Sequence, residues 1–321
     1  MTYSVGGTIE ATDYNGFVST TVGANVNATW GTGTTSAGYG QTALGTVSVG
    51  GTVTAASWAS LVNTISSMAN HQGTTITSRT APVAGGTIAV LAAVNTDIAS
   101  CYTNRGNAAA SGAQYTGWTG TNSKTTATSG ATWTITFTNT VTWASADAAR
   151  YFFNAGGLIK IDVSKTATGD VGDPEWNDLA TTLCGDIYIT GGDYTQTIAG
   201  VAYTGTTKIG GTGIPTTLAT TTGWFDLAAG GAATVVYKQF ADTAPYTANY
   251  IQHAIAKDAG SSVLTITTTW SASDGDAISG GTAASGATPG TAPCTIVTYY
   301  PPSSTYLTAS WGTPTVAATT A

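Results

Sequence analysis

Acidic side chains cluster in one short stretch, residues 168–176, which reads Thr-Gly-Asp-Val-Gly-Asp-Pro-Glu-Trp. Asp170, Asp173 and Glu175 bring carboxylates close to Trp176, and a pair of suitably placed carboxylates is the machinery of glycoside hydrolysis. A turn with solvated acidic side chains explains the same residues without any chemistry. The sequence favours the solvated turn and leaves Trp176 as a candidate contact for a sugar ring.

Nucleophiles and bases are scarce in the chain. Its 2 His, His71 and His253, lie far apart in sequence, and no Gly-x-Ser-x-Gly elbow presents a catalytic serine. Its 3 Cys, Cys101, Cys184 and Cys294, form no Cys-x-x-Cys pair, so neither a disulfide framework nor a zinc site is indicated. We therefore expect no catalytic residues, no bound cofactor and no enzyme activity, with the cysteines buried as small apolar side chains.

Asp274 and Asp276 share the Asp-x-Asp spacing of calcium-binding loops, in which oxygen ligands alternate along a turn. The Glu that completes an EF-hand loop is missing, however. An ordinary Asp-Gly hairpin turn is the alternative interpretation. These two residues are the candidate metal ligands that the sequence offers.

Aromatic residues in expected turns are candidates for contact with a glycan, because their rings can stack on sugars. Tyr115, Trp118 and Trp176 are the candidate contacts. Tyr39 and Tyr194 occupy similar turns. Anchoring of loops or contact between subunits would use the same side chains equally well.

Composition excludes several classes of protein. Charged residues are 8% of the chain, against about 25% in an average soluble domain. The formal net charge of −7 disfavours nucleic acid as a partner. The longest apolar run, residues 88–94, is too short to cross a membrane, and the first residues lack the basic and apolar segments of a signal peptide. These features predict a chain made in the cytoplasm but built to persist outside a cell.

A degenerate repeat marks the first hundred residues. Each copy begins with Gly-Gly-Thr, followed by a short extended step and an expected helix; the copies are residues 6–18, 50–62 and 85–98. The second helix is the clearest, because Trp58, Leu61 and Ile65 recur on one face. We expect Thr54 or Ser57 to cap this helix and Thr12 or Asp13 to cap the first one.

The composition and periodicity of the sequence change after residue 105. Residues 106–130 are expected to form a linker or long surface loop. Residues 131–143 alternate apolar side chains with Thr, which is the strongest strand signal in the chain, interrupted on the apolar side only by Asn139. Further short strands are expected at residues 158–163, 187–189, 234–238, 250–255, 263–270 and 295–299. The sequence predicts a mainly β fold: a small helical repeat region (1–105) for attachment, the linker (106–130), and an antiparallel, jelly-roll-like β-sandwich (131–321).

The Gly-Gly-Thr repeats, the Gly-Tyr-Gly-Gln at residues 38–41 and the Ala-Ala-Arg-Tyr-Phe-Phe-Asn-Ala-Gly-Gly at residues 148–157 carry a resemblance. With them the chain resembles virion structural proteins of tailed phages, of the cyanophage type, over most of its length. Members of that family are described as structural or tail-fibre-like. The resemblance implies a structural role and supplies no catalytic residues.

Together these observations predict a non-enzymatic phage virion protein in a tail fibre or other appendage. We expect a homo-oligomer, with a trimer favoured, that binds other virion proteins and contacts a host surface glycan without inserting into a membrane. A capsid decoration or cement protein is an alternative within the same class. A glycan-binding module is the alternative from another class.

Overall fold

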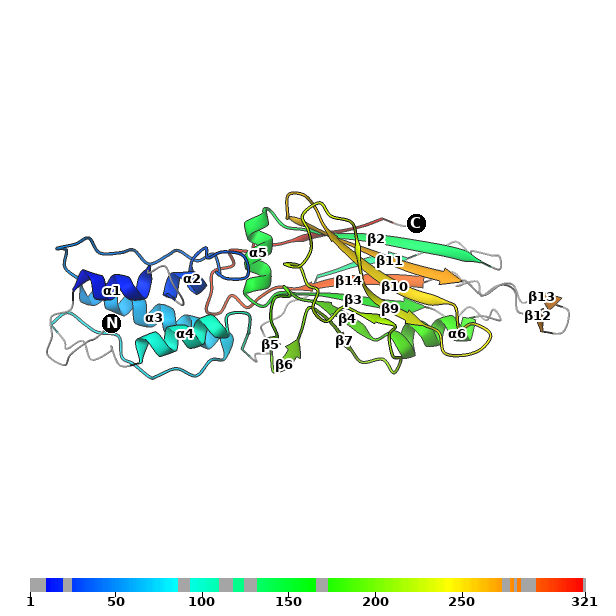
Figure 1. Ribbon diagram of the computed structural model, residues 1–321, viewed down its shortest axis with the longest axis horizontal. Helices are drawn as coiled ribbons and strands as arrows, with labels where there is room; N and C mark the ends of the chain where they lie inside the picture. Colours follow the sequence, from blue (N-terminus) through cyan, green and yellow to red (C-terminus); the bar gives the residue numbers. More distant parts are fainter. Residues whose placement is uncertain are drawn as a thin grey trace.

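The structure is a computed structural model, and it describes residues 10–19, 25–85, 93–109, 118–123, 132–165, 173–272, 278–279, 282–283 and 293–319. The molecule is elongated, with helices at one end and β-sheets at the other (Figure 1). The described fold is mostly β, with antiparallel sheets and some helices.

The helical end contains α1 (Ala11–Val18), α2 (Val26–Trp30), α3 (Ala55–Gln72) and α4 (Val94–Thr103). The prediction for α3 is confirmed. Its N-cap is Thr54, whose hydroxyl accepts a hydrogen bond from the backbone N–H of Ser57 at 3.1 Å. It ends at Gly73, which adopts the left-handed conformation (φ 66°) that a side chain would disfavour.

The cap expected for α1 is wrong. Glu10 is its N-cap, not Thr12 or Asp13, and the backbone N–H of Glu10 donates to the Asp13 carboxylate at 3.0 Å. Asp13 therefore serves as the reciprocal member of a capping box inside the first turn.

The β end consists of two larger antiparallel sheets, consistent with a β-sandwich (Figure 1). In the order of pairing, the first sheet contains β1 (Trp118–Ser123), β14 (Pro293–Tyr300), β3 (Leu158–Lys165), β4 (Asp186–Ile189) and β7 (Thr206–Ile209). The second contains β15 (Thr315–Thr319), β2 (Trp133–Thr142), β11 (Val263–Ala272), β10 (Tyr250–Lys257), β9 (Thr234–Phe240) and β8 (Thr217–Leu218). Two short hairpins, β5 (Gln196–Ile198) with β6 (Val201–Tyr203) and β12 (Ile278–Ser279) with β13 (Thr282–Ala283), complete the described strands.

Each strand expected after residue 130 is present as part of β2, β3, β4, β9, β10, β11 or β14. In β2 the buried positions alternate with partly or fully exposed ones, as the alternation of apolar residues and Thr predicts. Asn139 keeps this register and is buried on the apolar face.

The structure contains elements that the sequence did not predict, among them β1, β15 and α5 (Ala146–Asn154). β1 lies inside the stretch expected to be a linker, because its backbone pairs with β14 along its whole length although it lacks apolar alternation. α5 was not expected as a helix. Ser145 caps it by accepting a hydrogen bond from the N–H of Ala148 at 3.1 Å, and α5 lies where the helical end meets the sheets (Figure 1).

One hydrophobic core runs through both ends of the molecule. Trp58 of α3, Phe152 of α5 and Ile251 of β10 are fully buried members of the same cluster. The domain boundaries at residues 105 and 130 stay predictions, and side chains on both sides of them share this core. Within the described residues, no helix is long and apolar enough to cross a membrane.

Candidate functional site

Trp176 is not a surface residue. It lies in α6 (Asp173–Asp178), is 0% exposed, and its ring packs against those of Trp133 and Trp270, with centroid distances of 4.8 and 5.7 Å. Its expected contact with a glycan is therefore corrected: the indole is part of the core between the two sheets. The backbone of Trp118 lies in β1, whereas its side chain and all of Tyr115 are outside the described residues.

The expected solvated acidic turn is also wrong at Glu175, which is 8% exposed. α6 brings Trp176 into the core and carries Glu175 inward with it. Burial, followed by the charges of Asp178 and Asp242, raises the pKa of Glu175. Asp170, and the calcium loop expected at Asp274 and Asp276, lie outside the described residues.

The two histidines are structural. His71 and His253 are each 1% exposed, and burial lowers the pKa of His71 to about 4 and that of His253 to about 3. His71 Nε2 lies 2.9 Å from the carbonyl oxygen of Ala155, which assigns the ring proton to Nε2 because a carbonyl only accepts. His253 Nδ1 lies 3.0 Å from the Thr268 hydroxyl, and the imidazole stacks on the ring of Tyr237.

The cysteines give no reactive thiolate. Burial raises the pKa of both Cys101 and Cys184 to about 12. Burial also raises the pKa of Cys294, which is half-buried. Thiols with such pKa values stay protonated at neutral pH and are poor nucleophiles.

The helical end meets the sheets at a place that we call the junction, where α5 packs against residues 32–41. Arg150 Nη1 donates to the carbonyl oxygens of Thr32 and Ala37, at 2.7 and 3.0 Å. Asn154 Nδ2 donates to the carbonyl oxygen of Gly38 at 3.0 Å. These bonds tie residues more than a hundred positions apart in sequence.

Close approach across the junction requires glycine. A Cβ atom placed on Gly40 would collide with the ring of Tyr151. On the sheet side of α5, Phe152 packs edge-on against Phe153, and Phe153 stacks on Trp224 with ring centroids 5.5 Å apart. The Arg-Tyr-Phe-Phe-Asn motif therefore faces both ends of the molecule at once.

Two of the aromatic residues expected in turns, Tyr39 and Tyr194, anchor this junction. The hydroxyl of Tyr39 donates to the carbonyl oxygen of Arg105 at 2.6 Å, and its ring is fully buried. The Arg105 guanidinium lies over the rings of Tyr102 and Tyr194, at 4.6 and 4.5 Å from their centroids. Of the three interpretations given for these aromatic residues, namely contact with a sugar, anchoring of loops and contact between subunits, anchoring of loops fits the contacts of Tyr39 and Tyr194.

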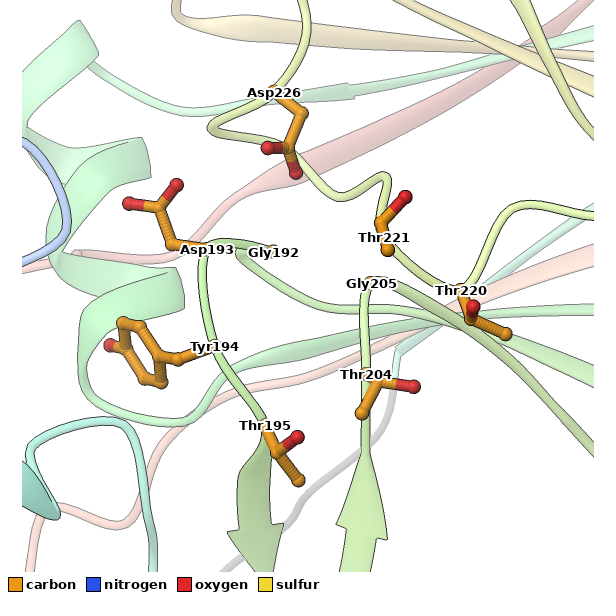
Figure 2. Close-up of a pocket in the computed structure, with 9 residues that line it drawn as sticks. All are labelled: Gly192, Asp193, Tyr194, Thr195, Thr204, Gly205, Thr220, Thr221 and Asp226. Atoms are coloured by element: carbon orange, nitrogen blue, oxygen red, sulfur yellow. The ribbon is translucent and has the colours of Figure 1, made fainter.

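A hollow of about 320 Å³ opens beside Tyr194. Figure 2 shows its lining, which comes from several turns at the ends of the short strands and consists of Gly192, Asp193, Tyr194, Thr195, Thr204, Gly205, Thr220, Thr221 and Asp226. Hydroxyls and two carboxylates dominate this lining, and the Tyr194 ring points away from its centre (Figure 2).

The turns hold the two carboxylates in place. Asp193 adopts a left-handed backbone (φ 57°), a conformation that Asp tolerates better than most residues. Asp226 accepts a hydrogen bond from the backbone N–H of Gly223 at 2.8 Å. The hollow offers hydrogen bonds to a small polyhydroxy ligand, whereas its lining contains no His, Cys or Lys for catalysis.

The sequence did not point to Asp193 and Asp226, because each is a lone acidic residue in a Gly- and Thr-rich stretch of a kind that is common throughout the chain. It also missed Asp178 and Asp242, which lie beside Glu175 in space. Comparison with family models, curated proteins and solved structures finds no match to this chain.

Proposed function

We propose that this chain is a non-enzymatic structural protein of a phage virion, a component of a tail fibre or other appendage that assembles as a homo-oligomer, with a trimer favoured. In this proposal the sheets form a jelly-roll-like sandwich that projects from the particle. The helical end attaches to other virion proteins or to sister subunits.

The observation that carries the proposal is the junction. Two stretches have the most distinctive sequence pattern: Gly-Tyr-Gly-Gln at 38–41 and the motif at 148–157. Both hold the two ends of an elongated molecule in a fixed arrangement (Figure 1). Such a joint serves a component that bears load or spans a distance. The buried, uncharged histidines and protonated thiols agree with a role that requires no catalysis.

Surface chemistry supports the same role. A chain with 8% charged residues makes subunit contacts that depend little on ionic strength, because salt screens exposed charges. Its 3 Cys and 2 Met leave few sites for oxidation outside a cell.

Contact with a glycan of the host is the second candidate function, and the hollow of Figure 2 favours it. Its hydroxyls and the carboxylates of Asp193 and Asp226 match the hydrogen-bonding groups of a sugar. A glycan array probed with wild type and with the Asp193→Asn/Asp226→Asn variant tests this function. Equal signals from both proteins would count against it.

Immunogold labelling of purified particles, with copy number from quantitative gels, tests the main proposal. We expect label at the tail or on filamentous projections, and a low copy number. Label spread evenly over the head at high copy number would identify a capsid decoration protein instead. Absence from the particle would overturn both virion roles.

A further inference from the structure

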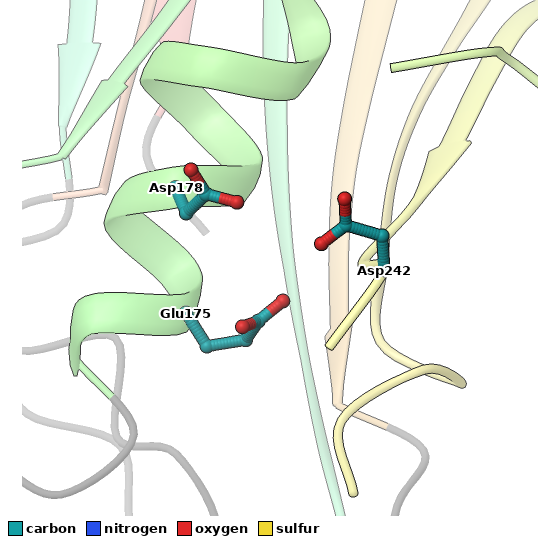
Figure 3. Close-up of side chains that lie close together, drawn as sticks. All are labelled: Glu175, Asp178 and Asp242. Carbon is teal, nitrogen blue, oxygen red and sulfur yellow. The ribbon is translucent and has the colours of Figure 1, made fainter. Parts of the chain in front are cut away.

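Three carboxylates converge beside the sandwich. Glu175 and Asp178 project from α6, and Asp242 follows β9 of the second sheet (Figure 3). One oxygen from each lies within 4.8 Å of the others. The chain has only 16 acidic residues, so the meeting of three at one point is notable for a protein so poor in charge.

The charges in this cluster are uncompensated within the described part of the chain. The described ion pairs use Asp97, Asp147, Asp162 and Asp186, and none involves the cluster. Glu175 and Asp178 are three residues apart on one helix, a spacing at which like charges repel. Without a cation the arrangement destabilises the fold.

Glu175 gives the second, independent observation. Its side chain is buried, at 8% exposure, and Oε1 has no hydrogen-bond partner. The backbone N–H of Thr243 donates to the Glu175 carboxylate, and the Thr243 hydroxyl donates to Asp242 Oδ1 at 3.2 Å, so this residue holds both carboxylates in place. Figure 3 shows the Glu175 carboxylate directed into the space between α6 and Asp242. An ionised, buried carboxylate oxygen without a donor is costly, and a bound cation removes that cost.

We propose that Glu175, Asp178 and Asp242 form a calcium site that clamps α6 to the end of β9. All three ligands would be carboxylate oxygens. Hard cations such as Ca²⁺ prefer oxygen ligands, whereas zinc and copper prefer nitrogen and sulfur. Oxygens in one calcium shell lie up to about 5 Å apart, twice the Ca–O distance, and the cluster meets this limit. Asp242 is exposed, so water completes the shell from the solvent side. Ligands from a helix and a loop suit the flexible coordination of Ca²⁺ better than the strict octahedron of Mg²⁺.

Calorimetric titration of the chelator-treated full chain with CaCl₂ tests the site. We expect binding with a Kd of roughly 10⁻⁴ to 10⁻³ M, the range of extracellular calcium modules, and a rise in Tm with CaCl₂. Glu175→Gln and Asp242→Asn should each weaken binding by at least about tenfold. Both should also raise the Tm of the calcium-free protein, because each removes a repelling charge.

Two matched controls separate this site from others. Asp226→Asn removes a carboxylate of the hollow. Asp274→Asn/Asp276→Asn removes the two carboxylates that the sequence suggests as calcium ligands. Both variants should bind calcium as wild type does. Asp242 is exposed, so its variant reports on the site even where Glu175→Gln folds poorly.

Four outcomes would overturn the proposal. The first is that neither binding heat nor a Tm shift is seen up to about 10 mM CaCl₂. The second is that calcium binding survives in both Glu175→Gln and Asp242→Asn, and the third is that binding is lost only in the Asp274→Asn/Asp276→Asn variant. The fourth is that MgCl₂ binds as tightly as CaCl₂.

Discussion

Gln41 and Thr308 are joined by two reciprocal hydrogen bonds. Gln41 Nε2 donates to the carbonyl oxygen of Thr308 at 2.8 Å, and the backbone N–H of Thr308 donates to Gln41 Oε1 at 2.8 Å. Ser310 adds a bond from its hydroxyl to the carbonyl oxygen of Tyr39. The loop before α3 is thereby tied to the segment after β14, and the helical end is fixed to the sheets at a point separate from α5.

Gln41→Ala should lower the free energy of unfolding by about 2–3 kcal/mol, because it removes both hydrogen bonds of a buried side chain and leaves the backbone N–H of Thr308 without its acceptor. Urea denaturation followed by tryptophan fluorescence and by far-UV circular dichroism measures the loss. Since the core is continuous, the two signals should change together in wild type.

Gln252→Ala is the matched control, because Gln252 is a half-buried glutamine of β10 outside the junction. It should cost less than about 1 kcal/mol. Two separate transitions in wild type, or equal losses in both variants, would contradict the idea that the Gln41–Thr308 pair joins the two ends.

Stability should fall as the pH drops from about 6.5 toward 4. An unfolded His titrates near 6.5, whereas folded His71 and His253 have pKa values of about 4 and about 3. Between these values the unfolded chain binds more protons than the folded one, so each His costs about 1.4 kcal/mol per pH unit of acidification.

Comparison of slopes isolates this effect. Burial raises the pKa of Glu175 and of Asp162, and these groups act in the opposite direction just above their ordinary pKa values. Unfolding free energies of wild type, His71→Gln and His253→Gln between pH 7 and 5 give the difference. Each variant should have a shallower slope than wild type, and parallel slopes would show that the imidazoles are not held neutral.

Local pattern predicted the elements whose signal is carried by neighbouring residues. The alternation in residues 131–143 identified β2 and its buried face, and the spacing of Trp58, Leu61 and Ile65 identified α3. The sequence did not predict β1 and β15. These edge strands consist mostly of Thr, Ala, Gly and Asn with little apolar alternation, and pairing of their backbones makes them strands. α5 escaped because its aromatic run faces two packing partners instead of one.

The sites depend on residues that are distant in sequence. Gln41 with Thr308, and Glu175 with Asp242, meet only once the sheets and helices have formed. Trp176 was misplaced for a related reason. A Trp beside carboxylates looks like a sugar platform in sequence, and only the packing of α6 against Trp133 and Trp270 reveals it as core.

In the native protein, only Cys294 should react with a thiol reagent such as DTNB at about pH 8, and more slowly than a free cysteine. It is half-buried with a raised pKa, while Cys101 and Cys184 are buried with pKa values of about 12. Absorbance at the release of thionitrobenzoate counts the reacting thiols, and guanidinium should expose all 3. Native Cys294→Ser should give no change in absorbance with DTNB. Rapid labelling of that variant would reveal a reactive thiol and weaken the non-enzymatic proposal.

Asn139 is the polar exception on the buried face of β2, opposite Ile266 of β11 and Ala318 of β15. It is 0% exposed, and neither its Oδ1 nor its Nδ2 has a hydrogen-bond partner. Asn139→Val should therefore raise the free energy of unfolding by about 1–3 kcal/mol, because it removes the desolvation cost of the amide and suits a strand.

Thr140→Val, at the adjacent position on the other face of β2, is the control, and it should change stability by no more than about 0.5 kcal/mol. Urea titration of both variants gives the comparison. A loss of stability in Asn139→Val would mean that the amide is satisfied in solution, as by a second copy of the chain or by bound water, and size-exclusion chromatography of the variant would separate these two causes. A gain confined to Asn139→Val would place this amide among the costs that the fold carries, as the uncompensated carboxylates around Glu175 are.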